Sequence, residues 1–483
     1  MNTDLFLNQV KSDIEDCLNK KQYENALVLI RMCADITYCY NQYYCDDVLE
    51  DYLKEISEAV LQDTKIEQTE KKTILFYDGF GYNDRGLIQI YLKALCKIGK
   101  VIYITRDKSR NSIPDVLSIL NENNGISFFI KDDPFVKQIK YVSNIVETYK
   151  PAHMFMYTYP HDVVIPVVFN KYDGIIKRYQ INLTDHAFWL GKNSFDYCIE
   201  FRDWGASLSY FYRNLDKSKI VMLPYYPNIN WKQEFLGYPF PFDEKKQRFI
   251  FSGGQLYKTL GGENKYYKII DYILAKYPDV IFWYAGSGNR TEMDKLIKKY
   301  PERLYLTAER KDFFQIIQRC EFYLSTYPYC GGLMFQYAAA AGKVPLTLRY
   351  DSATDGFLIN QEKLGIEFDT IADILRETSK LLSNKYYLKK QNNNMNRAII
   401  SENKFLYNLR TLMMYGNTEY LCNFDDIDLS RLKKSTKELM DTNRLYKMVS
   451  AYKKWIVASR YKKIFLQGRI LRLRDKLFRV FYK

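Results

Sequence analysis

The sequence predicts an α/β protein with two consecutive doubly wound domains, and three features of its 483 residues lead to this prediction. From residue 73 onward, short apolar runs alternate with amphipathic segments, as in parallel sheets covered by helices on both faces. A stretch with four prolines at 224–247 then interrupts the alternation. A second series of apolar runs and helical segments follows it. The chain is long enough for two or three domains.

The first 70 residues predict helices rather than strands. Apolar residues recur at helical spacing over 5–18, 23–38 and 48–61. Residues 22–27 are similar to part of a tetratricopeptide helix pair, but one such unit is too few for a repeat array. A polar stretch at 62–72 then reads as a linker to the first sheet.

The apolar runs define the expected strands. They lie at 73–78, 100–105, 126–130, 152–157, 178–183 and 196–200 in the first series, and at 248–253, 280–286, 303–307, 321–326 and 344–348 in the second. We therefore expect a helical region at 1–70, Rossmann-like domains at 71–235 and 236–420, and a helical tail at 421–483. In such domains ligands bind at the carboxyl ends of the strands, so the two domains are expected to face a cleft.

Cysteine usage and the N-terminus indicate a cytoplasmic protein. The nine cysteines are odd in number and include no Cys-x-x-Cys pair, so we expect neither a disulfide framework nor a zinc site. The N-terminus lacks the apolar core of a signal peptide. No apolar run approaches the ~18 residues of a membrane-spanning helix. The only Asp-x-Asp, Asp426 to Asp428, lies in a polar stretch between helices, and no essential metal is expected.

The positive charge is concentrated at the end of the chain. Residues 444–483 hold 13 lysines and arginines against one acid, Asp475, a net +12 of the total +14. Apolar and aromatic residues, Trp455 and Phe465 among them, are interleaved with the basic ones. Basic amphipathic helices suit an anionic membrane surface. The alternative is a helix packed on the body of the protein. No recognition module accompanies the tail, so nucleic acid is not an expected partner.

A candidate phosphate site begins the second domain. Gly253 and Gly254 directly follow the strand at 248–253, and Lys258 comes four residues later. Glycines after a strand let the backbone approach a diphosphate, and a lysine there neutralises its charge. An ordinary turn with a surface lysine explains this short pattern equally well.

The stretch at 325–342 gives a more specific signal. A strand runs into a loop with proline and glycine, and a helix of small residues then begins near Leu333. The N–H groups of Gly332, Leu333 and Met334, after Gly331, would form an anion site at the helix start. Close packing of helix and strand would explain the alanines, but it would not explain the two glycines.

These motifs resemble the donor half of GT-B glycosyltransferases. The likeness covers residues 73–420 as architecture and rests on Ser252-Gly-Gly with Lys258, Tyr-Ala-Gly-Ser-Gly at 284–288, and Thr-Tyr-Pro-Tyr-Cys-Gly-Gly-Leu at 326–333. The last loop is also similar to the branch with O-linked N-acetylglucosamine transferases and bacterial protein glucosyltransferases. The resemblance implies a hexosyltransferase that moves a sugar from a nucleotide-sugar, UDP-linked, to a glycan, lipid-linked or protein acceptor. It implies donor contacts by Tyr329 and Gln336, and no further cofactor. Glu309 follows the strand at 303–307, a location that suits recognition of the base or ribose, although an ordinary surface loop would explain it equally well.

The sequence departs from one pattern of that fold. Many retaining GT-B enzymes carry two glutamates eight positions apart, where this chain has Pro328 and Gln336. This difference favours an inverting enzyme, which needs a base for the acceptor hydroxyl.

Histidine is suited to that role, since it titrates near pH 6.5. His186 follows the strand at 178–183 and is the predicted base, whereas Asp185 is expected to point elsewhere. A histidine that only satisfies backbone groups in the loop is the alternative. His161, after the strand at 152–157, is the rival, and His153 is taken as structural.

Asn83 and Arg85, in the loop after the first strand, are predicted to contact the acceptor, although a plain turn would explain them equally well. Two other functions remain open for the chain as a whole. One is a nucleotide-sugar epimerase of the same fold, and the other is a non-catalytic GT-B-like subunit that supports a partner.

Overall fold

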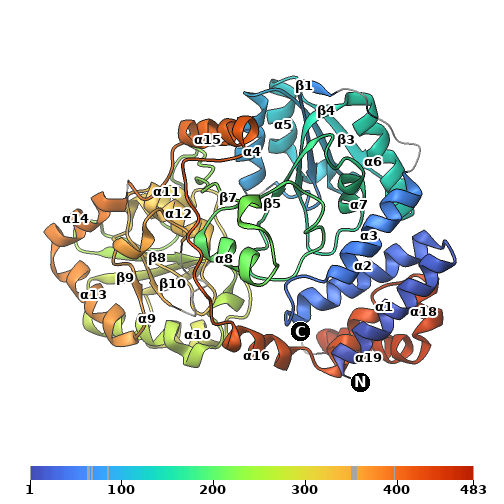
Figure 1. Cartoon of the computed structure of the whole chain (residues 1–483). Coiled ribbons are helices and arrows are strands. Elements are labelled where there is room, and N and C mark those ends of the chain that lie inside the picture. Colours follow the sequence, from blue (N-terminus) through green and yellow to red (C-terminus); the bar gives the residue numbers. More distant parts are fainter. Residues whose placement is uncertain are drawn as a thin grey trace. The chain divides into compact units, whose positions relative to one another are not determined.

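The computed structural model describes residues 2–61, 66, 69–83, 86–349, 356–395 and 397–481, without the side chains at 431 and 478–481 (Figure 1). The chain forms two compact units. Unit 1 comprises residues 1–223 and 406–483, and unit 2 comprises residues 224–405. Each unit contains one parallel sheet flanked by helices, so the two predicted Rossmann-like domains are confirmed.

The sheet of unit 1 has seven parallel strands in the order β3-β2-β1-β4-β5-β6-β7. Their bounds are β1 Glu70–Asp78, β2 Lys100–Arg106, β3 Ile126–Ile130, β4 Pro151–Tyr157, β5 Lys177–Ile181, β6 Tyr197–Glu200 and β7 Ile220–Met222. The first strand lies inside the sheet, with β2 on one side and β4 on the other. The connections therefore diverge between β1 and β4, where doubly wound sheets bind ligands.

The sheet of unit 2 repeats this arrangement with the order β10-β9-β8-β11-β12-β13. Its strands are β8 Arg248–Gly253, β9 Val280–Ala285, β10 Leu304–Thr307, β11 Tyr323–Leu324, β12 Pro345–Leu348 and β13 Glu367–Phe368. Here the connections diverge between β8 and β11, at the loops that carry the predicted donor motifs. The two strands that the sequence analysis missed, β7 and β13, are three and two residues long.

Helices cover both faces of the sheet of unit 1. They are α1 Thr3–Asn19, α2 Tyr23–Tyr40, α3 Asp47–Val60, α4 Leu87–Cys96, α5 Pro114–Glu122, α6 Phe135–Tyr149, α7 Val164–Lys171 and α8 Asp203–Phe211. The three N-terminal helices are present as predicted. Asp46 caps α3 by accepting a hydrogen bond from the Leu49 N–H (3.3 Å). These helices belong to the body of unit 1, because α3 packs on α7 and α2 packs on α6.

Helices also flank the sheet of unit 2. They are α9 Lys265–Lys276, α10 Thr291–Lys299, α11 Phe313–Arg319, α12 Gly332–Ala340, α13 Ile371–Ser383 and α14 Lys385–Met395, and α15 Glu402–Tyr415 crosses the boundary at 405. Of the helices that the structure describes, none is long and apolar enough to cross a membrane.

The proline-rich segment is not a free linker. Residues 224–247 belong to unit 2, and their aromatic rings pack beside its sheet. Phe240 stacks on Tyr305 with ring centroids 4.1 Å apart and meets Trp283 edge-on at 5.1 Å. The unit boundary consequently falls at 223/224 rather than at the expected 235/236. Residues 406–420, which were expected in the second domain, lie in unit 1.

The basic tail folds back onto unit 1. It consists of α16 Ser430–Leu439, α17 Thr442–Val449, α18 Trp455–Arg460 and α19 Lys462–Phe481, which lie beside α1 and α2 in Figure 1. Leu445, Val449 and Val457 are fully buried in the same core as the N-terminal helices. Arg460 pairs with Asp13 of α1 (2.6 Å). Four apolar residues of α17 and α18 that were expected at a membrane surface are therefore core residues instead: Leu445, Val449, Ile456 and Val457. Trp455, at the start of α18, is 84% exposed.

Candidate functional site

The loops after β8, β9, β10 and β11 meet at one edge of the sheet of unit 2. Gly254 adopts a positive φ of 126°, which favours glycine. A Cβ atom on Gly286, after β9, would lie 1.9 Å from the Gly254 carbonyl oxygen, so the two loops touch through their backbones. Gln255 joins a third loop to them, because its Nε2 donates to Ser287 Oγ (3.0 Å) and to Glu309 Oε1 (2.6 Å).

Lys258 lies in the short 3-10 helix Leu256–Thr259 that follows β8. Its carbonyl oxygen accepts a hydrogen bond from the Tyr329 N–H (3.2 Å), which joins the loop after β8 to the loop after β11. Its Nζ lies 3.7 Å from the position that a Cβ on Gly331 would occupy. Burial lowers the pKa of Lys258, and no acidic side chain pairs with it among the described residues. Within the described part of the chain, this lysine is therefore a half-buried cation without an acidic partner.

The helix start beside Lys258 presents backbone donors. In α12 the first intrahelical bond is donated by the Phe335 N–H to the Gly331 carbonyl (3.1 Å), and Gly331 supplies no side-chain cap. The N–H groups of Gly332, Leu333 and Met334 precede that bond. A Cβ on Gly332 would lie 2.3 Å from the Phe357 ring, so only glycine fits there without movement. The ammonium group of the lysine and the positive end of the helix dipole are the chemistry that suits an anion.

The other predicted donor contacts differ in their exposure and their hydrogen bonds. Tyr329 is 45% exposed beside Tyr257, with ring centroids 6.4 Å apart. Gln336 is buried, and its Nε2 donates to the carbonyl oxygens of Tyr225 and Phe357 (both 3.2 Å). Its buried Oε1 has no hydrogen-bond partner in the described part of the chain. Glu309 is exposed but bonded to Gln255, which the sequence analysis had not selected.

In unit 1, His186 lies in the loop between β5 and β6. Its side chain is 54% exposed, and its Nδ1 lies 3.5 Å from Asp185 Oδ1. Asp185 is buried and accepts a hydrogen bond from Arg202 Nε (2.6 Å). Burial alone would raise the pKa of Asp185, but Arg202 and His186 hold it down at about 2. The expectation that Asp185 points elsewhere was wrong, because β5 ends at Ile181 and strand alternation no longer applies four residues later.

Two buried side chains hold the loop of His186 in place. Arg213 donates to the carbonyl oxygens of Asp185 (2.8 Å) and Ala187 (2.7 Å), on either side of the histidine. Glu50 of α3 accepts hydrogen bonds from the N–H groups of Gly191 (2.8 Å) and Asn193 (3.4 Å). Burial raises the pKa of Glu50 to about 7. Both residues are distant in sequence, and no local motif identifies them.

His161 is packed more tightly than its rival. It lies in the loop after β4, and its Nδ1 is 3.6 Å from Asp35 Oδ1 of α2. Its side chain is 23% exposed, and burial lowers its pKa to about 4, so the ring is neutral at pH 7. His153 lies within β4, and its Nδ1 is 3.2 Å from the Tyr179 hydroxyl. The geometry therefore favours His186, which is exposed, over the other two histidines.

The loop after β1 is fixed by hydrogen bonds to other residues of unit 1. Asn83 Nδ2 donates to Asp115 Oδ2 (2.8 Å), and its Oδ1 accepts from the Asp115 N–H (2.8 Å), so this side chain is bonded to the start of α5. Buried Asp78 accepts from the Gly81 N–H (2.9 Å) and the Tyr103 hydroxyl (2.6 Å). Arg85, the other predicted acceptor contact, lies outside the described residues.

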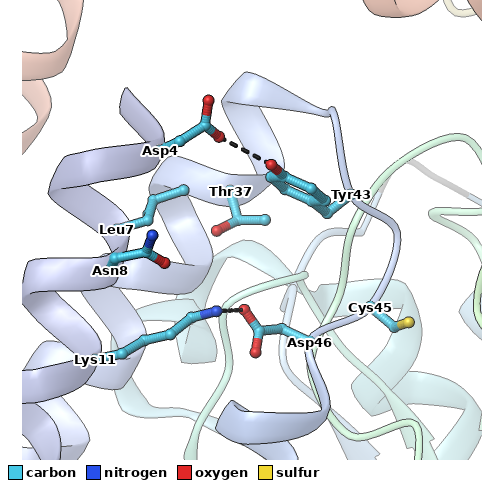
Figure 2. A pocket seen from close by; sticks show the side chains of 8 residues that line it. All are labelled: Asp4, Leu7, Asn8, Lys11, Thr37, Tyr43, Cys45 and Asp46. Carbon is cyan, nitrogen blue, oxygen red and sulfur yellow. Dashed lines mark hydrogen bonds and ion pairs between the residues drawn. The ribbon is translucent and has the colours of Figure 1, made fainter. Parts of the chain in front are cut away.

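A pocket of about 330 Å³ lies among the N-terminal helices of unit 1 (Figure 2). Lys11 pairs with Asp46 across it (2.5 Å), and the Tyr43 hydroxyl donates to Asp4 Oδ1 (3.0 Å). These four polar groups partner one another, so the pocket presents no exposed charge comparable to Lys258 among the residues that line it.

The fold is shared with known sugar-nucleotide proteins. A glycosyltransferase from Rickettsia africae is similar over 72% of this chain and all of its own length, with 10% identity and a TM-score of 0.53. A putative UDP-N-acetylglucosamine 2-epimerase from Listeria monocytogenes is similar over 74% of this chain and all of its own (12%, TM-score 0.51). The Neisseria meningitidis UDP-GlcNAc 2-epimerase bound to UDP-GlcNAc covers 71% and 100% (13%, TM-score 0.50).

These similarities establish that the chain has the GT-B fold of two Rossmann-like domains. The predicted fold is thus confirmed. No family model matches the sequence, and no curated protein matches it.

Proposed function

We propose that the chain is a glycosyltransferase that takes its sugar from a nucleotide-sugar held at the sheet edge of unit 2. One observation carries the proposal. Lys258, a half-buried cation paired with no acid in the described part of the chain, lies beside the uncapped start of α12, where the connections of the sheet diverge. A diphosphate is the group that this combination of ammonium and backbone N–H donors suits.

The donor is proposed to be UDP-linked and the sugar a hexose derivative. The structurally similar epimerase from Neisseria is bound to UDP-GlcNAc, and its two-domain fold is the one found here. Tyr329 supplies an exposed ring for the base or the sugar. The Oε1 of Gln336, which has no hydrogen-bond partner among the described residues, is an acceptor for a hydroxyl.

The reaction is proposed to invert the anomeric carbon, with His186 as base. The acceptor oxygen attacks the anomeric carbon while His186 Nε2 takes its proton, since Nδ1 faces Asp185. The bond from the anomeric carbon to the diphosphate oxygen breaks, and its electron pair leaves with the nucleoside diphosphate. Lys258 and the start of α12 stabilise that departing charge, so we propose that no essential metal is required.

The acceptor is proposed to be a glycan, a lipid-linked sugar or a protein. A UDP-sugar 2-epimerase is the second candidate, because two of the similar structures are epimerases. An assay without acceptor separates the two functions. Interconversion of the free nucleotide-sugar would favour the epimerase. UDP release that requires an acceptor, with only slow hydrolysis of the donor in its absence, supports the transferase.

The proposal is tested first at Lys258. Lys258→Ala removes the ammonium group, so we expect UDP affinity to fall at least ~10-fold in calorimetry. Lys268→Ala, an exposed lysine on α9 of the same unit, is the matched control and should leave affinity unchanged. If Lys258→Ala binds UDP as tightly as the wild type, the diphosphate site is not at this helix start. If the wild type binds no nucleotide, the chain is instead the non-catalytic subunit.

A further inference from the structure

The terminal helix α19 has two distinct faces. One face packs on the body of unit 1: Tyr461 and Phe465 are buried around its start, and a Cβ on Gly468 would lie 2.0 Å from the Tyr446 carbonyl oxygen of α17. The only acid of the helix, Asp475, pairs with Lys447 of α17. These contacts fix which side of α19 turns away from the protein.

That outer side carries an apolar stripe. Leu466 is 48% exposed, Ile470 67%, Leu473 60% and Leu477 50%. Their spacing of four, three and four residues keeps them on one side of a helix. At about 100° per residue, they lie roughly 140–200° around the axis from Gly468, opposite the packed face. Large apolar side chains in such a row are expensive to leave in water.

Basic residues border this stripe on both sides. Lys462, Arg469 and Lys476 lie roughly 80–120° from Gly468, and Lys463 and Arg474 lie roughly 220–240° from it. All five are exposed. Asp475 lies on the packed side, where it pairs with Lys447, and it is also 3.8 Å from Arg474. The outer half of α19 therefore combines an apolar row with basic residues, of which Arg474 has an acidic neighbour.

We infer that the outer face of α19 docks in the plane of an anionic lipid bilayer. The apolar row would enter the boundary between headgroups and acyl chains while the flanking lysines and arginines contact lipid phosphates. Charge complementarity selects this occupant, since a groove on another protein would satisfy the row without requiring positive charge on both sides. The inference does not depend on the donor site, and it concerns the outer face of α19.

Vesicle co-sedimentation of the full chain tests the inference. Wild-type protein should partition at least ~10-fold more strongly to vesicles of phosphatidylglycerol and phosphatidylcholine than to phosphatidylcholine alone. The variant Ile470→Gln/Leu473→Gln should lose ~10-fold or more of the binding to anionic vesicles. Leu5→Gln/Tyr386→Gln, at two large exposed positions elsewhere, is the matched control and should bind like the wild type.

The variants alter exposed side chains, so their unfolding temperature and UDP affinity should equal those of the wild type. Unchanged binding of Ile470→Gln/Leu473→Gln to anionic vesicles would overturn the inference, and so would equal binding of wild type to both kinds of vesicle. Light scattering provides a further check. A dimer that Ile470→Gln/Leu473→Gln abolishes, with no vesicle binding, would assign the face to a second copy of the chain.

Discussion

At the scale of single residues, the two ring nitrogens of His186 have different surroundings. Its Nδ1 faces Asp185, which Arg202 keeps ionised, and this leaves Nε2 for the acceptor proton in the proposed reaction. A carboxylate in that position fixes the tautomer and stabilises the imidazolium that forms when the proton is taken. His161 has a carboxylate neighbour too, but it is packed against α2 and less exposed.

The first prediction concerns these two histidines. His186→Ala should reduce release of UDP from the nucleotide-sugar ~10²-fold, because the proton of the attacking hydroxyl would have no acceptor. UDP affinity, measured by calorimetry, should remain within ~2-fold of wild type, since the proposed donor site lies on unit 2. His161→Ala is the matched variant and should retain most of the turnover. A larger loss in His161→Ala would transfer the role of base to that residue.

The second prediction concerns Glu50. Its pKa is about 7 in the folded protein, because burial outweighs the hydrogen bonds from the loop, whereas the unfolded value is near 4.5. Between these values the folded state binds more protons, so this group stabilises the fold at low pH and loses that contribution as pH rises through 7. From pH 5 to pH 8 the loss should be roughly 1–3 kcal/mol.

Urea unfolding of wild type and Glu50→Gln at several pH values measures this contribution. His153 and His161, whose pKa values are lowered by burial, change stability with pH in the opposite direction. Their contributions cancel when the unfolding free energy of one protein is subtracted from that of the other. Between pH 5 and pH 8, the unfolding free energy of Glu50→Gln should therefore rise relative to that of the wild type. A difference that does not depend on pH would mean that Glu50 is ionised in both states.

At the scale of elements, the sequence was sufficient for the sheets and insufficient for the tail. Every apolar run that was long enough became a strand, because burial on both faces leaves a continuous apolar signature. The missed strands β7 and β13 are too short to leave one. Helical periodicity gave the helices of the tail, but it cannot tell whether an apolar face meets a membrane or the core of the same protein.

Candidate site residues were predictable to the extent that they follow strands. The connections that follow strands contain Lys258, Gly331 and His186, and parallel sheets bring functional groups together at those ends of the strands. Glu50 and Arg213 were not predictable, since they reach the His186 loop from α3 and from the turn after α8 through tertiary contacts alone. The role of Asn83 in capping α5 depends on the same kind of contact.

The third prediction concerns the packing of α19 on α17. Gly468→Ala would place a methyl group 2.0 Å from the backbone oxygen of Tyr446, which cannot move without shifting a helix. We expect a loss of roughly 1–3 kcal/mol in unfolding free energy and earlier protease cleavage within α19. Gln467→Ala, at the exposed neighbouring position, should be neutral. Equal stability of the two variants would show that α19 does not approach α17 so closely.

At the scale of the whole molecule, the N-terminal helices and the tail helices of unit 1 pack against each other. Arg460 of α18 pairs with Asp13 of α1, the Tyr452 hydroxyl donates to Asp35 of α2 (3.0 Å), and the Tyr461 hydroxyl donates to Asp13 (2.7 Å). Asp35 also neighbours His161 in the loop after β4. Residues 441–465 therefore complete the core of unit 1, and residues 466–481 add a surface to it.

The last prediction compares two shortened chains. A chain that ends at residue 465 keeps the buried side chains of α17 and α18, so it should fold, bind UDP like the full chain and lose binding to anionic vesicles. A chain that ends at residue 440 lacks Leu445, Val449 and Val457, each fully buried, and should lose more than about 4 kcal/mol of unfolding free energy. Urea unfolding and calorimetry with UDP measure these outcomes. If the chain ending at 440 is as stable as the full chain, the tail is not part of the core. If the chain ending at 465 still sediments with anionic vesicles, the membrane contact lies elsewhere than on α19, because the apolar row and most of the flanking basic residues are then absent.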